Sequence, residues 1–315
     1  KGRDKPNLLF IWTDEQRADT IQAYGNARIK SPNLSRLASE SVVFQNAYVS
    51  QPVCTPSRAT VMTGLWPHQS GCTQNNVALS AKTPVFPELL NDDDYVSGYF
   101  GKWHLGDEVF PQHGFHEWRS IEDTYWSYFR EDKDVNTKSD YCNWLKELGY
   151  QPDTDRDDFS RGFAARLPLE HCKPKFLENQ TCDFLRRHRH EPFVLFVNFL
   201  EPHMPFTGPL NHLHSPDEVE LPINFDDPID EYEPLIYQKK AEKFRGQYGE
   251  FNLAEESEWR RLIAHYWGLV SQVDLSLGAI LGELERLDLV DNTIVVFTSD
   301  HGDMMGSHCL VEKSV

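Results

Sequence analysis

Three segments of this chain are predominantly apolar without alternation, and each becomes charged as soon as it ends. Their sequences are "NLLFIWT" at residues 7–13, "FVLFVNFL" at residues 193–200 and "TIVVFTS" at residues 293–299. A strand with one wet face alternates apolar and polar residues, whereas a strand covered on both faces does not need to alternate. These runs therefore predict buried strands of a parallel sheet with helices on both faces.

The rest of the chain alternates helical and extended patterns, which favours one large α/β domain with a mostly parallel central sheet. Helices are predicted after Ser31, from Pro56 to about Gly64, and at residues 83–92, 173–190 and 255–287. Further strands are predicted at residues 41–49 and 95–103. Residues 110–170 are predicted to be an insertion with short local elements, and residues 210–252 a long surface loop rich in Pro and acidic residues.

Polar side chains follow the predicted strands directly. Asp14 and Glu15 come after the first strand, and Asp300 and His301 come after the last. The carboxyl ends of parallel strands meet at one edge of a sheet, so neighbouring strands would bring these groups together. Several carboxylates in a partly desolvated cleft need a cation, and oxygen ligands suit calcium or magnesium. Since histidine is an unusual calcium ligand, magnesium and manganese stay open.

Cationic and imidazole side chains gather at the same predicted edge. The segment "GKWHLG" places Lys102 and His104 two residues apart after a strand, which puts both side chains on the same side of an extended chain. His203 follows another strand, Arg58 lies one helical turn beyond Cys54, and Lys313 lies near the last residue. Together these groups could bind a tetrahedral anion and protonate a leaving group.

The charge balance and hydropathy exclude two classes of partner. The chain has 315 residues, with 31 Lys and Arg against 49 Asp and Glu, a formal charge of −18. No basic stripe can neutralise a phosphate backbone, so nucleic-acid binding is not expected. No apolar run approaches the ~20 residues that cross a bilayer, so no membrane span is expected.

Cys54 begins the segment "CTPSR", just ahead of a predicted helix. A thiol at a helix N-terminus has a lowered pKa and could act as a nucleophile, but a lone cysteine is usually a small buried residue. The six cysteines contain no C-x-x-C pair, so a zinc ribbon or a thioredoxin motif is not indicated.

The segment "CTPSR" resembles the C-x-P-S-R signature of the type I, formylglycine-dependent sulfatases of the alkaline phosphatase superfamily. Four further segments are similar to that family, in the same order: "NLLFIWTDE", "TGLWPHQSG", "GKWHLG" and "TSDHGD". The resemblance implies an alkaline-phosphatase-like α/β/α sandwich. It implies that residues 1–315 are the catalytic domain and that a smaller C-terminal domain lies outside this chain.

The resemblance also implies a role for each matching residue. Cys54 would be oxidised to formylglycine by a formylglycine-generating or an anaerobic sulfatase-maturating enzyme, and the hydrated aldehyde would be the nucleophile. Arg58 and His104 would support it, and His104 would be the base. Sulfate oxygens would be held by Lys102, His203 and Lys313, of which His203 or Lys313 would protonate the leaving alcohol. The metal, with calcium favoured over magnesium or manganese, would be held by Asp14, Glu15, Asp300, His301 and the modified Cys54. Asn75 is a further candidate for the sulfate pocket.

Two departures from the family pattern bear on the activity. Many members carry Asp where this chain has Glu15 and Asn where it has His301. The Asp-His form occurs in a branch that includes phosphonate monoester and phosphodiester hydrolases, whereas "GKWHLG" is typical of sulfatases.

The predicted function is hydrolysis of a sulfate ester, with a sulfated saccharide as substrate because aromatic residues accompany arginines in residues 116–163. The alternatives are a phosphonate monoester or phosphodiester hydrolase, and a non-catalytic binding protein if Cys54 stays unmodified. The family expectation is a periplasmic or secreted enzyme, with a lysosomal one as the alternative. An oligomer or a second chain could complete the site.

Overall fold

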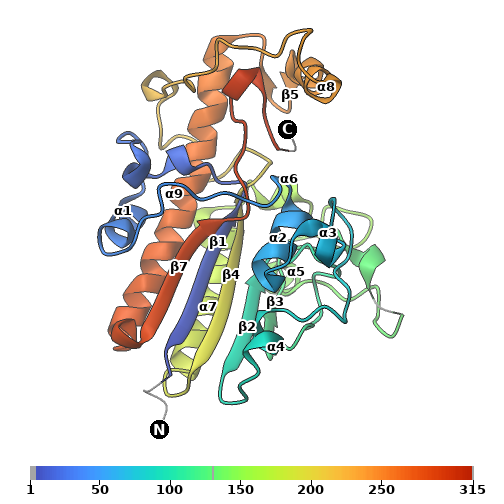
Figure 1. Cartoon of the computed structure of the whole chain (residues 1–315), viewed down its shortest axis with the longest axis vertical. Helices are drawn as coiled ribbons and strands as arrows, with labels where there is room; N and C mark the ends of the chain where they lie inside the picture. Colours follow the sequence, from blue (N-terminus) through green and yellow to red (C-terminus); the bar gives the residue numbers. More distant parts are fainter. Residues whose placement is uncertain (1–4, 130, 314–315) are drawn as a thin grey trace.

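The computed structural model describes residues 5–129 and 131–313 of the chain. Its main sheet has five strands, all parallel, in the order β3-β2-β4-β1-β7 (Figure 1). Their bounds are β1 (Asn7–Asp14), β2 (Val96–Gly101), β3 (Glu117–Arg119), β4 (Phe193–Pro202) and β7 (Thr293–Ser299). The three predicted buried strands are therefore β1, β4 and β7, and they lie side by side at the centre and one edge of the sheet.

Helices cover both faces of this sheet, so the domain has three layers. Leu9 and Ile11 of β1 belong to the larger core with α7 (Lys173–Arg187) and α9 (Glu256–Arg286). Trp12, on the opposite face of β1, belongs to the core with α2 (Cys54–Thr63). This division of one strand between two cores explains why its sequence does not alternate.

The remaining elements are shorter. The other helices are α1 (Pro32–Ser39), α3 (Pro67–Ser70), α4 (Phe86–Leu90), α5 (Asp140–Glu147), α6 (Arg161–Ala164) and α8 (Leu235–Phe244), and a small hairpin is formed by β5 (Gln247–Tyr248) and β6 (Phe251–Asn252). Single 3₁₀ turns occur at Ala18–Thr20, Gln22–Tyr24, Trp126–Tyr128, Leu169–His171, Pro216–Glu218, Val290–Asn292 and Ser307–Cys309.

The predicted strand at residues 41–49 is wrong. This segment has no regular structure, and its large side chains Val42, Phe44 and Tyr48 are exposed. It pairs with none of the described strands, and an extended apolar pattern without a pairing partner does not form a ladder. Beside it, a groove of about 810 Å³ lies against β7 and α1 and contains none of the predicted site residues.

The predicted surface loop at 210–252 is only partly correct, because it contains α8 and the β5–β6 hairpin. Ala241 and Phe244 of α8 are buried and belong to the larger core, so this segment is more than a surface loop. The predicted insertion at 110–170 stays a prediction; in it, β3 adds an edge strand to the sheet.

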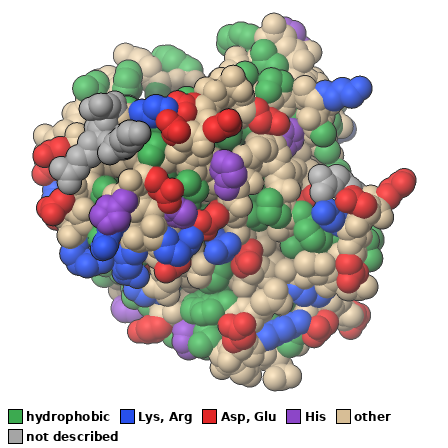
Figure 2. Space-filling view, turned by 90° about the horizontal axis from the view of Figure 1, so that it is seen from below, with side chains coloured by type: hydrophobic (Ala, Val, Ile, Leu, Met, Phe, Trp, Pro, Cys, Tyr) green, Lys and Arg blue, Asp and Glu red, His purple; other side chains and the backbone are tan. Residues whose placement is uncertain are grey.

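No helix in the described part of the chain combines the length and apolar character that crossing a bilayer requires. Seen from below, at the end where the chain enters the sheet, the surface carries both acidic and basic side chains (Figure 2). The polar groups predicted to be functional lie at the other end of the sheet, beyond the carboxyl ends of β1, β4 and β7.

Candidate active site

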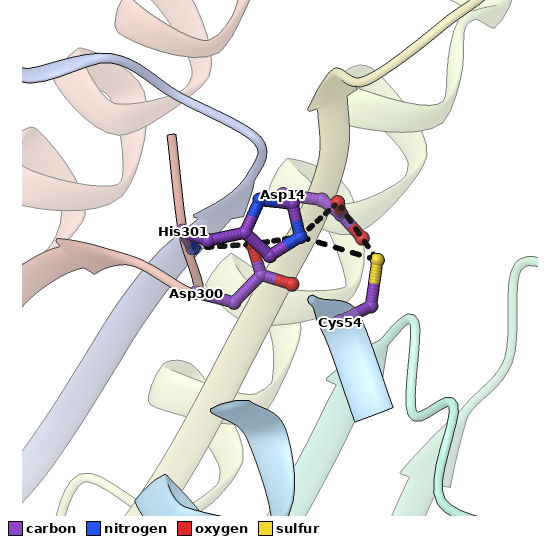
Figure 3. Close-up of side chains that lie close together, drawn as sticks. All are labelled: Asp14, Cys54, Asp300 and His301. Atoms are coloured by element: carbon purple, nitrogen blue, oxygen red, sulfur yellow. Dashed lines mark hydrogen bonds and ion pairs between the residues drawn. The ribbon is translucent and has the colours of Figure 1, made fainter. Parts of the chain in front are cut away.

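The parallel neighbours β1 and β7 end together and bring their polar residues into one cluster. Asp14 is the last residue of β1, Asp300 and His301 follow β7, and Cys54 begins α2 (Figure 3). One ligand atom from each of these four buried residues lies within 4.8 Å of the others. The Cys54 Sγ is 3.2 Å from His301 Nε2 and 3.7 Å from Asp14 Oδ1. The polar residues that follow β1 and β7 therefore lie together, as the sequence predicted.

Glu15 extends this cluster toward β4. Asp14, Glu15 and His203 form a second buried group whose ligand atoms lie within 4.8 Å of one another. Glu15 has a left-handed backbone with φ 70°, and its carbonyl accepts a hydrogen bond of 2.5 Å from the Tyr266 hydroxyl. Burial, with added repulsion from Asp303 and Asp14, raises the pKa of Glu15 although Lys313 opposes the rise. Its Oε1 is buried and has no hydrogen-bond partner among the described residues.

Arg58 is fully buried and joins the carboxylates of both strands. Its Nε donates to Asp300 Oδ2 at 2.9 Å and its Nη2 to Asp14 Oδ2 at 2.8 Å. Its Nη1 donates to the Lys102 carbonyl at 2.6 Å and to Asn198 Oδ1 at 3.0 Å. Because every guanidinium nitrogen is engaged, Arg58 supports the cluster and is not free to bind a substrate.

Two lysines place positive charge beside Cys54. Lys102 Nζ is 2.5 Å from Asp14 Oδ2 and 4.0 Å from the Cys54 Sγ, and Lys313 Nζ is 2.6 Å from Glu15 Oε2. Burial and Asp14 would raise the pKa of the Cys54 thiol, but Lys102, Lys313 and the hydrogen bond with His301 lower it below its usual value. The position thus favours negative charge on the atom that residue 54 presents.

The two candidate histidines are held neutral. Burial and the positive charge of Lys102 keep the pKa values of His104 and His203 well below the usual range. The His104 Nε2 lies 2.8 Å from Asn76 Oδ1, and an amide oxygen only accepts hydrogen bonds, so the neutral ring carries its hydrogen on Nε2. Its Nδ1 is then a free acceptor, buried without a partner among the described residues. A base at this position is chemically available.

Backbone geometry corrects one expectation about the "GKWHLG" segment. The strand β2 ends at Gly101, and His104 has a left-handed φ of 56°, so the chain there is not extended. Lys102 and His104 reach the same cavity through this turn. Glu108 holds the turn, because its carboxylate accepts 2.7 Å and 2.5 Å hydrogen bonds from the backbone N–H groups of Trp103 and His104.

A cavity of about 330 Å³ opens above the cluster. Six predicted site residues line it: Cys54, Asn75, Lys102, His104, His203 and Lys313. The Asn75 Oδ1 accepts a 3.0 Å hydrogen bond from the Thr55 N–H, so Asn75 also fixes the start of α2. The structure thus brings together all eleven predicted residues, with the other five, Asp14, Glu15, Arg58, Asp300 and His301, buried in the carboxylate cluster.

Sequence reasoning missed five residues of this region. Asn76, Thr124, Tyr125 and Arg161 line the cavity, and Glu108 supports the turn that carries His104. Asn76 adjoins the predicted Asn75, and Glu108 follows "GKWHLG" closely, so both had a weak local signal. Tyr125 and Arg161 come from residues 110–170, whose sequence has no periodicity that would show which side chains reach the site.

Comparison with known proteins places these features in a family. A family model described as Sulfatase matches residues 6–313. The chain is 29% identical, over an alignment of 329 residues, to the uncharacterized sulfatase YidJ of Escherichia coli, which covers 98% of this chain and 59% of that protein. It is 26% identical over 366 aligned residues to an N-acetylglucosamine-6-O-sulfatase of Bacteroides thetaiotaomicron, with 98% and 60% covered.

A solved structure supports the fold. The phosphonate monoester hydrolase of Agrobacterium radiobacter superposes with a TM-score of 0.77 at 22% identity, covering 99% of this chain and 65% of that one. The chain therefore spans about three fifths of the length of the proteins that it matches.

Proposed function

The chain belongs to the sulfatase family, and from that premise we propose that its whole protein hydrolyses the sulfate ester of a sulfated saccharide. Water and the ester would give the free alcohol and inorganic sulfate. The observation that carries this proposal is the position of Cys54, at a helix N-terminus, at the base of a cavity and beside Lys102 and His301. The N-acetylglucosamine-6-O-sulfatase relative supports a saccharide as substrate.

We infer that Cys54 is the precursor of formylglycine, whose hydrate would supply an oxygen nucleophile that no encoded side chain offers. The segment "CTPSR" supports this, as does the positive surrounding of the residue. Cys54 is only 1% exposed, so a modifying enzyme would reach it before the chain folds. The identity of that enzyme, the oligomeric state and the periplasmic, secreted or lysosomal location stay predictions.

The residues at the ends of β1 and β7 fit a divalent cation. Asp14, Glu15 and Asp300 offer carboxylate oxygens and His301 offers a nitrogen, and the buried Glu15 Oε1 makes no hydrogen bond that would occupy it as a ligand atom. Oxygen-rich ligation favours calcium, with magnesium or manganese as alternatives. When bound, the cation would act as a Lewis acid that polarises oxygen atoms at the site.

The side chains that line the cavity could bind the sulfate group and transfer protons. Lys102 and Lys313 are charged, because burial is outweighed by Asp14 and Glu15 and the lysine pKa values are raised. They can therefore bind sulfate oxygens, and their charge counts most where negative charge grows in the transition state. His104 can accept a proton on Nδ1. Protonation of the leaving alcohol falls to His203 or Lys313, which both line the cavity.

One observation favours a second candidate function. Asp300 is followed by His301, the form found in phosphonate monoester and phosphodiester hydrolases of the superfamily. A phosphonate or phosphodiester has the same tetrahedral anion to bind, so the cavity alone does not separate the two classes. If Cys54 stays a thiol, the remaining alternative is a binding protein without activity.

Hydrolysis rates measured in parallel on sulfate esters and phosphorus esters separate the candidate functions. The full-length, metal-loaded and formylglycine-bearing protein should be given sulfated monosaccharides, a phosphodiester and a phosphonate monoester. We expect kcat/KM on at least one sulfate ester to exceed that on both phosphorus esters by about 100-fold, the discrimination typical of a site built for its substrate. Faster phosphonate or phosphodiester hydrolysis would assign the protein to the other class.

A further inference from the structure

One charged side chain of the cavity, Arg161, has no role in the mechanism above. Arg161, the first residue of α6, lines the cavity together with Tyr125. Its side chain keeps 24% of its surface exposed, whereas the Glu122 side chain that holds it is 2% exposed. Arg161 is thus anchored by a buried carboxylate, and it lines the cavity with part of its side chain exposed.

The anchor leaves one end of the guanidinium available. Arg161 Nε donates to Glu122 Oε2 at 2.7 Å, and Nη2 pairs with the same oxygen. Nη1 makes no hydrogen bond with the described residues, and it is not sealed from solvent. A planar guanidinium fixed on one edge presents its other edge in a set direction, which suits a carboxylate or a sulfate.

The negative charge of Glu122 does not balance the positive charges that surround it. Glu122 also pairs with Lys173, whose side chain is 6% exposed, so one carboxylate faces two cations. Burial raises the pKa of Glu122, but Arg161 and Lys173 lower it to about 2, and it stays ionised. Glu201 is close to Lys173, and because burial raises its pKa to about 7 it adds only part of a negative charge at neutral pH. Arg161 and Lys173 therefore share one fully ionised carboxylate.

Tyr125 gives this part of the cavity an apolar wall. Its ring packs on His104, with 4.6 Å between the ring centroids, and it lines the cavity together with Arg161. An aromatic face beside a cation is suited to a sugar ring that carries an anionic substituent.

We propose that Arg161 is a specificity-determining residue that binds a second anionic group, a carboxylate or a second sulfate, on the saccharide whose sulfate ester is cleaved at residue 54. This rests on the proposed function. The reacting sulfate has its own cations in Lys102 and Lys313, of which Lys102 lies 4.0 Å from the Cys54 Sγ. Arg161 then selects polyanionic over neutral sulfated sugars.

The test compares three substrates with the same scissile sulfate: a neutral monosulfated sugar, a monosulfated uronic acid and a disulfated sugar. The wild-type full-length protein should prefer one or both polyanions. Arg161→Gln should raise KM for the preferred substrate about 10- to 100-fold more than for the neutral sugar, as loss of one charge-assisted contact predicts. The kcat values should change far less, and Arg161→Lys should recover part of the preference.

Controls separate this role from a structural one. Arg166→Gln removes a nearby exposed guanidinium and should leave all three profiles unchanged, and Arg161→Lys keeps a cation beside Glu122 if Arg161→Gln folds poorly. The comparison of uronic acid with disulfated sugar shows which anion is recognised. Equal losses on all three substrates, or a wild type without preference for the polyanions, would overturn the inference while leaving the sulfatase proposal intact. A wild type with verified formylglycine that cleaves no sulfate ester would overturn both.

Discussion

Replacing Cys54 by alanine is expected to lower kcat/KM for sulfate esters by about 10⁴-fold or more, the scale of loss when a nucleophile is removed. The side chain is buried, and its Sγ contacts His301 and Asp14 and no large apolar cluster. Stability should therefore change little, by about 1 kcal/mol. Steady-state kinetics on the best sulfate ester, with thermal unfolding of the same sample, measures both.

A second cysteine variant provides the control for this result. Cys72 is also buried, and its thiol contacts the Val77 carbonyl at 3.5 Å, away from the carboxylate cluster. Cys72→Ala should retain activity. If Cys54→Ala also kept most of its activity, residue 54 would not carry the chemistry, and the cavity would have to act without it.

Replacing Arg58 by methionine is expected to destabilise the metal-free protein by about 3–5 kcal/mol, because buried Asp300 loses its arginine partner and buried Asp14 keeps only Lys102. Arg58 pairs with Asp14 and Asp300, and its guanidinium also lies 4.9 Å from the centre of the Trp12 ring. Denaturant unfolding in a chelator measures the loss. A divalent cation should then restore part of the stability, since a ligand that binds only the folded state stabilises it.

The matched control is Arg166→Met, which removes an exposed guanidinium and should cost little. A loss below about 1 kcal/mol for Arg58→Met would mean that the folded protein does not depend on Arg58 to compensate the two buried carboxylates. That outcome would also weaken the case for a metal at the same carboxylates.

The central strands could be predicted because their physical cause lies within each segment. A continuous apolar run such as residues 193–200 is stable only when covered on both faces, and β4 is buried along nearly its whole length. The polar residues after each strand then follow from the rule that parallel strands share an edge. Residues 41–49 have a similar local pattern, but none of the strands in the described part of the chain pairs with them.

The support of the site could not be predicted from local patterns. Arg161 pairs with Glu122, which also pairs with Lys173, and these residues are 39 and 51 positions apart, so no periodic or motif signal links them. Glu108 lies close to Trp103 and His104 in the sequence, but only the turn shows that its carboxylate accepts hydrogen bonds from their backbone. By contrast, Cys54 could be singled out since its five-residue segment carries a chemical signature of its own.

The most direct test of the central claim is the mass of the tryptic peptide spanning residues 37–58, which ends at Arg58 and contains Cys54. It should be taken from full-length protein produced with a sulfatase-maturating enzyme. Conversion of the thiol to the aldehyde predicts a peptide about 18 Da lighter than the encoded one. The rate of sulfate release should rise in proportion to the lighter fraction. An active protein in which every peptide keeps the full thiol mass would contradict the account.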